Sequence, residues 1–213
     1  EPQELLARIR MVLRRTERDL EANPLTRLPG NVSILDELSR LIESKALFAV
    51  CYIDLDKFKS YNDKYGFEHG DEVIRETARI LLQTTHESEN PNDFVGHIGG
   101  DDFVIITDLK NADKLCQKII SDFEKTAPSF YNEADRKNGY IIGFDRKGQE
   151  QKIPLLSVSI GVVTNEFRTI DHVAQVGEIG AELKSFAKSL ERSNYVKDQR
   201  KVQNREQNNR PAP

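Results

Sequence analysis

Apolar side chains recur three and four positions apart in several long segments, the spacing that places them on one face of a helix. We expect helices at 2–22, 33–43, 69–86, 111–125 and 171–190. Other apolar runs are continuous or alternate with polar residues, which favours strands. These runs predict strands at 46–53 and 153–164 and a short one at 195–196.

A glycine turn joins two further strands. The apolar runs 93–98 and 103–107 flank Gly-Gly-Asp-Asp at 99–102, which predicts a β-hairpin. The expected order is then helix, strand, helix, helix, hairpin, helix, strand, helix. Strands interleaved with helices around an antiparallel hairpin predict a ferredoxin-like α/β sandwich, in which helices flank a central mixed, mostly antiparallel sheet.

Composition divides the chain into three parts. Residues 1–22 carry a heptad seam, so we expect a linker or coiled-coil helix covered by a second copy or by an upstream domain, or else lying on its own domain. Residues 23–196 hold the expected sandwich, with a polar insertion at about 128–152. Residues 197–213 are polar and predict a disordered tail. Because the chain opens with Glu1 rather than Met, we expect it to be a segment of a longer protein.

Charge narrows the classes of function. The 213 residues include 31 Lys and Arg against 35 Asp and Glu, a formal net charge of −4, which argues against a nucleic-acid-binding face. No apolar run reaches the ~18 residues of a membrane span, and there is no signal-peptide pattern. Cys51 and Cys116 lie in separate apolar segments. They favour core packing over a disulfide and predict a cytoplasmic protein.

Four carboxylates are expected at the ends of strands. Asp54 and Asp56 end the central apolar run, and Asp101 and Asp102 lie at the hairpin tip. Each segment alone fits an ordinary strand end or turn. If the strands are neighbours, however, the carboxylates converge on one edge of the sheet, and hard oxygen ligands held close together suit Mg²⁺ or Mn²⁺. Such a site holds metal ions for transfer at phosphorus.

Four motifs in this order resemble those of the GGDEF family, the diguanylate cyclase domains. They are DLDKFKSYNDKYG at 54–66, GDEV at 70–73, GGDDF at 99–103 and SVSIG at 157–161. The resemblance runs from Asn23 to about Asn194 and implies a nucleotidyl-cyclase-type sandwich. It also implies that two GTP molecules condense to cyclic di-GMP with release of pyrophosphate. Each 3′-hydroxyl would attack the α-phosphate of the partner nucleotide across a homodimer.

The resemblance also implies roles for individual residues. Metal binding would fall to Asp54, Asp101 and the carbonyl of Leu55, and Asp101 or Asp102 would help to activate the 3′-hydroxyl. The nucleotide contacts would come from Phe58 and Lys59 at the phosphates, Asn62 and Asp71 at guanine, Gly99 and Gly100 against the substrate, and Lys188 and Arg192 at a second phosphate position. An Asp carboxylate accepts hydrogen bonds from guanine N1–H and the N2 amine, which adenine does not offer.

The sequence departs from the family pattern at several positions. Asp102 stands where the family usually has Glu, which shortens the reach of the carboxylate and predicts slower catalysis. Three further departures are Phe67 for His, His97 for Arg and Glu191 for Gly.

The inhibitory product site of many relatives is an Arg-x-x-Asp motif. The corresponding residues here are Asn90 and Asp93, and Asn90 supplies no guanidinium fork. Asp93 is then only a remnant of that site, and we predict no ordinary product inhibition through it.

The segment 4–15 resembles the closing helix of a receiver domain, which implies a response regulator whose upstream receiver or sensor domain controls dimerisation. The leading hypothesis is an active cyclase. One alternative is a degenerate GGDEF domain that binds GTP or cyclic di-GMP without turnover. Another is a structural dimerisation module that works through residues 2–22. An assay for cyclic di-GMP separates the three.

Overall fold

The computed structural model describes residues 3–5, 8, 21–144 and 148–200. The expected helix at 2–22 lies largely outside the described residues, as does the end of the expected tail, 201–213. Among the described residues, no helix is both long enough and apolar enough to cross a membrane.

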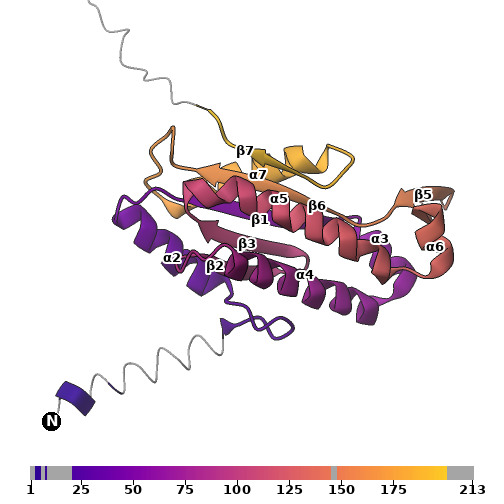
Figure 1. Cartoon of the computed structure of the whole chain (residues 1–213), viewed down its shortest axis with the longest axis horizontal. Helices are drawn as coiled ribbons and strands as arrows, with labels where there is room; N and C mark the ends of the chain where they lie inside the picture. Colours follow the sequence, from indigo (N-terminus) through magenta and orange to yellow (C-terminus); the bar gives the residue numbers. More distant parts are fainter. Residues whose placement is uncertain (1–2, 6–7, 9–20, 145–147, 201–213) are drawn as a thin grey trace, which may run out of the picture.

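A five-stranded sheet forms the centre of the molecule (Figure 1). Its order is β2 (Phe94–Gly99), β3 (Asp102–Thr107), β1 (Ala49–Asp56), β6 (Ser157–Thr164) and β7 (Asn194–Lys197). Strand β1 is antiparallel to both β3 and β6, and only β6 and β7 pair in parallel. The sheet is therefore mixed and mostly antiparallel, which confirms the predicted fold class.

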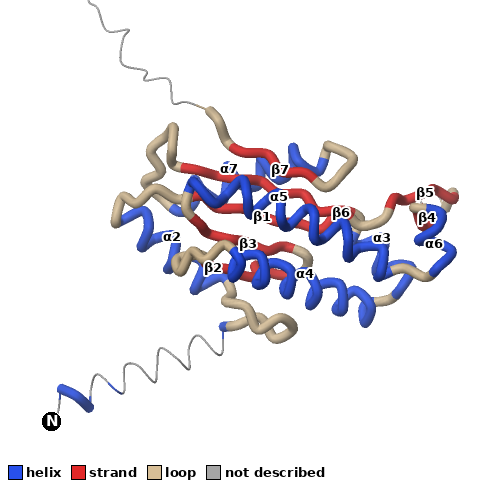
Figure 2. Tube along the Cα trace, viewed as in Figure 1, coloured by secondary structure: helices blue, strands red, loops and turns tan. Residues whose placement is uncertain are grey.

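Helices cover both faces of this sheet (Figure 2). One face packs against α4 (Phe67–Glu87) and α5 (Leu109–Thr126), and the other against α2 (Asn31–Glu43) and α7 (Val173–Lys188). The short helix α3 (Phe58–Tyr65) links β1 to α4. The helices predicted at 33–43, 69–86, 111–125 and 171–190 are confirmed as elements, with ends that differ by a few residues.

Alternation along β1 assigns its side chains to the two layers. Cys51, Ile53 and Leu55 belong to the core beneath α4 and α5, whereas Val50 belongs to the core beneath α2 and α7. Asp54 is four residues from Val50 in the strand, so its side chain lies on the same face as that of Val50 and faces α7. Cys51 and Cys116 are both buried free thiols with their Sγ atoms 3.7 Å apart, as core packing predicts.

The expected strand 153–164 is in fact two strands, so this prediction is wrong in its bounds. Ile153 belongs to β5 (Glu150–Pro154), which pairs with β4 (Tyr140–Phe144) in a separate two-stranded sheet. The main chain leaves this hairpin before β6, and the hydroxyl of Tyr131 accepts a hydrogen bond from the Leu156 N–H at 2.8 Å. The insertion also holds η1 (Ala127–Phe130) and α6 (Glu133–Asn138).

The start of the expected tail is also placed differently. Lys197 is the last residue of β7, and Asp198 is only 4% exposed. Arg168 and Arg200 form ion pairs with the Asp198 carboxylate, and its N–H donates to the carbonyl of Val162. These pairings explain how a polar segment is held in the fold.

Candidate active site

Asp54 and Asp102 face each other across β1 and β3. They are direct cross-strand partners, so their side chains lie on the same face of the sheet. The ammonium group of Lys184, on α7, contacts the Asp102 carboxylate and lies 3.2 Å from Asp54 Oδ2. Lys188 Nζ lies 2.5 Å from Asp54 Oδ1. Two carboxylates and two ammonium groups thus form one charged cluster at the ends of these strands.

Burial dominates the electrostatics of this cluster. Asp54 is 3% exposed, and desolvation raises its pKa from 3.8 to about 6, although Lys188 and Lys184 oppose the rise. Burial alone would lower the pKa of Lys184, but its hydrogen bond to Asp102 and the charge of Asp54 raise it overall. The buried carboxylate therefore requires a cation beside it.

Asp56 has a different environment, although it lies two residues from Asp54. Its carboxylate accepts hydrogen bonds from Ser157 Oγ at 2.7 Å and from Ser159 Oγ at 2.9–3.0 Å. Burial raises the pKa of Asp56 overall, and the two hydroxyls oppose that rise. The serines of the fourth motif thus hold Asp56 as a fixed part of the strand end.

The hairpin turn leaves open space over its backbone. Gly99 and Gly100 have φ angles of 150° and 58°, values that favour glycine, and an added Cβ at either position would meet no atom of the described residues within 4 Å. The carbonyl of Gly100 accepts a hydrogen bond from His97 Nε2 at 3.0 Å, so Nδ1 is free to accept from the Thr26 hydroxyl at 2.9 Å. His97 thereby fixes the turn.

Asp101 lies in this turn, one residue before the position that pairs with Asp54. It is partly exposed. The structure therefore brings Asp102 together with Asp54, while the metal-binding role of Asp101 stays a prediction.

One residue, Lys57, separates Asp56 from the first turn of α3. Lys57, its N-cap, has a left-handed φ of 64° and, within the described part of the chain, makes no side-chain cap hydrogen bond. The N–H groups at the start of a helix bind anions well when no side chain caps them. Phe58 and Lys59 begin this helix, the former partly buried against the core and the latter exposed. Their predicted place at the phosphates is thus compatible with the local backbone.

Asn62 and Asp71 come from different helices that meet at a glycine. A Cβ on Gly70 would lie 1.9 Å from Asn62 Oδ1, so the side chain of Asn62 rests against the backbone of α4 beside Asp71. Asn62 Oδ1 is buried and has no hydrogen-bond partner among the described residues. An unpaired buried acceptor of this kind is free to accept from the exocyclic amine of a base.

The two phosphate residues predicted near the end of α7 have different surroundings. Lys188 lies in the carboxylate cluster, whereas Arg192 is exposed after the helix ends. Lys184 is not among the residues predicted from the sequence. Its spacing of four from Lys188 places both on one helix face, a signal that could have suggested it.

The Asp93 carboxylate is held by its own loop and by the end of β3. Its carboxylate accepts hydrogen bonds from Ser88 Oγ at 2.5 Å, Asn90 Nδ2 at 2.6 Å and Thr107 Oγ1 at 2.6 Å. Whether Asp93 is only the remnant of a product site stays a prediction.

The donor set suits a divalent cation in its chemistry. A buried carboxylate that needs a counter-charge, a second carboxylate opposite it and the backbone carbonyl of Leu55 are all hard oxygen donors. Among residues 3–5, 8, 21–144 and 148–200, however, no group of three or more acidic, His or Cys side chains has an arrangement that could hold a metal ion. A metal ion at this edge of the sheet would therefore need donors beyond the side chains that these residues bring together.

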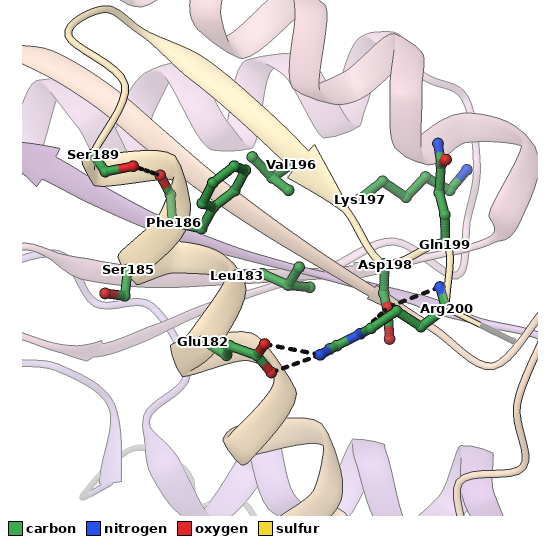
Figure 3. A pocket seen from close by; sticks show the side chains of 10 residues that line it. All are labelled: Glu182, Leu183, Ser185, Phe186, Ser189, Val196, Lys197, Asp198, Gln199 and Arg200. Carbon is green, nitrogen blue, oxygen red and sulfur yellow. Dashed lines mark hydrogen bonds and ion pairs between the residues drawn. The ribbon is translucent and has the colours of Figure 1, made fainter. Parts of the chain in front are cut away.

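A pocket elsewhere on the molecule is distinct from this cluster. It lies between α7 and the segment from β7 to Arg200, beside Phe186 (Figure 3). There the Arg200 guanidinium forms two hydrogen bonds with Glu182 and one with Asp198. None of the predicted site residues lines this pocket.

Comparison with known proteins assigns the family. The family model "Diguanylate cyclase, GGDEF domain" matches residues 21–144, more than half of the chain. This match includes both cross-strand aspartates, the glycine turn and the junction of α3 with α4. The chain therefore belongs to the GGDEF family.

Two curated relatives illustrate the likeness. Diguanylate cyclase DosC of Shigella sonnei is 36% identical over 98 residues, covering 45% of this chain and 20% of the relative. Diguanylate cyclase DgcS of Shewanella oneidensis is 33% identical over 91 residues, covering 42% of this chain and 29% of the relative. The chain thus matches less than a third of the length of either protein.

Solved structures share the fold. The coiled-coil and GGDEF segment of DgcB from Caulobacter crescentus, solved with c-di-GMP, aligns with a TM-score of 0.65 at 20% identity, covering 92% of this chain and 95% of that chain. The active GGEEF domain of a Vibrio cholerae diguanylate cyclase aligns with a TM-score of 0.56 at 20% identity, covering 78% and 92%. At this identity, the likeness establishes the fold alone.

Proposed function

We propose that this chain is the catalytic domain of a diguanylate cyclase, which condenses two GTP molecules into cyclic di-GMP and two pyrophosphates. The observation that carries the proposal is the pairing of Asp54 with Asp102 at the ends of β1 and β3, within a chain of the GGDEF family. Asp54, Asp101 and the Leu55 carbonyl would hold Mg²⁺ or Mn²⁺, which when bound neutralises the triphosphate and polarises the α-phosphate.

The protein's own groups would bind and orient the nucleotide. Asn62 and Asp71 hold guanine, the start of α3 with Lys59 holds the phosphates, and Lys188 supplies a second cation. In each half-reaction a bond forms between the 3′-oxygen and the partner's α-phosphorus, and the bond from that phosphorus to the β-phosphate oxygen breaks. Pyrophosphate leaves, and the carboxylate of Asp101 or Asp102 accepts the proton of the 3′-hydroxyl.

The reaction would need two copies of the domain. One domain binds one GTP and supplies half of the reacting groups, so two domains must face each other. The segment before residue 23 would couple an upstream receiver or sensor domain to this pairing. We therefore expect the rate per domain to rise with protein concentration.

The test is to incubate the protein with GTP and Mg²⁺ and to quantify cyclic di-GMP by liquid chromatography and mass spectrometry. We expect product from the wild type and none from Asp101→Ala, whereas Asp36→Ala, an exposed change on α2, keeps full activity. Binding of GTP without turnover at concentrations that dimerise the protein would replace the proposal with a binding module. Neither binding nor turnover would leave only a structural role.

A further inference from the structure

Lys184 lies between Asp54, a carboxylate assigned to the metal, and Asp102, its cross-strand partner. Its ammonium group bridges the two carboxylates, and its side chain is 22% exposed against 5% for that of Asp54. Among the described residues, this half-buried amine is the one that contacts both carboxylates, and together with Lys188, 2.5 Å from Asp54 Oδ1, it supplies the counter-charge that the strand ends require. The cluster is thus neutralised by the protein itself.

Close packing of α7 holds Lys184 in this place. A Cβ on Gly161 of β6 would lie 2.7 Å from the backbone nitrogen of Lys184. One helical turn earlier, a Cβ on Gly180 would lie 2.4 Å from the ring of Tyr52 on β1. Because neither glycine has a side chain, α7 lies directly on β1 and β6. This close packing brings the ammonium group of Lys184 into contact with the two carboxylates.

We propose that Lys184 is a built-in counter-ion that must release Asp54 before a divalent cation binds there. The proposal rests on the proposed function in one respect. That function supplies the anion with which Lys184 pairs after its release, the triphosphate of a nucleotide. Released from the carboxylates, the ammonium group pairs with phosphate oxygens brought by the substrate. Metal and nucleotide therefore bind cooperatively, and the domain alone holds metal weakly.

Manganese binding without nucleotide tests this proposal. Free Mn²⁺ is measured by electron paramagnetic resonance during titration of the metal-free chain, for the wild type and for Lys184→Met. We expect Lys184→Met to bind Mn²⁺ at least tenfold more tightly, and Lys184→Arg, which keeps the charge, to bind like the wild type. Equal affinity in the wild type and Lys184→Met would overturn the proposal.

Two control variants isolate the bridging contact. Lys118 contacts the carboxylates of Glu87 and Asp122 as Lys184 contacts its pair, but on the α4–α5 face. Lys57 is exposed and lies near enough to lower the pKa of Asp56. We expect Lys118→Met and Lys57→Met to leave Mn²⁺ affinity within twofold of the wild type. A tenfold gain in Lys57→Met would show that general charge, and not the bridge, sets the affinity.

A measurement on the wild type covers the case in which Lys184→Met fails to fold. In nitrogen-15 spectra of lysine side chains, a bridging ammonium group gives a protected Nζ signal, and we expect saturating Mg²⁺ to abolish that of Lys184. A signal that stays unchanged at saturating Mg²⁺ would refute the exchange. Neither measurement uses GTP. If Lys184→Met binds Mn²⁺ more tightly than the wild type while the wild type makes no cyclic di-GMP, the result contradicts the proposed function but not the role of Lys184.

Discussion

Replacing Asp54 by Asn is expected to stabilise the metal-free domain at neutral pH and to abolish cyclic di-GMP synthesis. Burial raises the pKa of Asp54 from 3.8 to about 6. The folded state therefore keeps the proton to a higher pH than the unfolded chain does. The stability that protonated Asp54 contributes is lost as the pH rises from about 4 to above 6.

The size of this effect follows from the shift. A difference of about two pKa units, at ~1.36 kcal/mol each, corresponds to ~3 kcal/mol at most. Because Asn keeps the shape of the carboxyl group without its charge, we expect Asp54→Asn to be about 1–3 kcal/mol more stable than the wild type at pH 7.5 and nearly equal to it at pH 4. Activity is lost because Asn removes the anionic oxygen assigned to the metal.

Urea unfolding in the presence of a chelator, at pH 4, 5.5 and 7.5, measures the difference. Asp36→Asn, an exposed change on α2, is the matched control and should stay within about 0.5 kcal/mol of the wild type at each pH. The reasoning is refuted if Asp54→Asn is less stable than the wild type at pH 7.5, or if the gap between them does not change with pH.

Two further predictions concern the nucleotide and the product. Gly70→Ala places a Cβ 1.9 Å from Asn62 Oδ1, so we expect the KM for GTP to rise about tenfold with a smaller change in kcat. In the control Gly177→Ala, the added Cβ meets no atom of the described residues within 4 Å, and both constants should stay the same. Steady-state kinetics measures both constants, and an unchanged KM in Gly70→Ala counts against the assignment of Asn62 to guanine. Asp93→Ala leaves the hydroxyl of Thr107 without its acceptor and should cost about 1–3 kcal/mol in thermal unfolding. Calorimetric titration should detect no tight cyclic di-GMP binding in either the wild type or this variant, and tight binding lost with Asp93 would contradict the prediction.

Periodicity predicted the elements of this fold because most of its helices and strands bury one continuous apolar face. It failed where a short apolar run serves two elements. Ile153 continues the pattern of β6 in the sequence, yet it pairs with Ile141 in the separate hairpin. The polar composition after residue 196 likewise predicted a disordered tail that includes Asp198. No local pattern indicates that Arg168, thirty residues earlier in the chain, forms an ion pair with the Asp198 carboxylate.

The candidate site was predictable as a set of acidic strand ends but not as a charged cluster. The hairpin motif led to Asp102, and the central apolar run led to Asp54. Only the sheet shows that β1 and β3 are neighbours and that these two residues are in direct register. Lys184 was missed because its role depends on how closely α7 approaches β6 at Gly161, a contact between residues far apart in the sequence.

The two cysteines, Cys51 on β1 and Cys116 on α5, allow the opening of the core to be timed. Cys51 and Cys116 are both 0% exposed, and the mutual contact of the thiols and their burial raise the pKa of Cys116 well above its usual value. A thiol-alkylating reagent therefore modifies them only when α5 separates from β1. The rate of labelling under native conditions then reports the frequency of that separation, without any need for a ligand or a turnover assay.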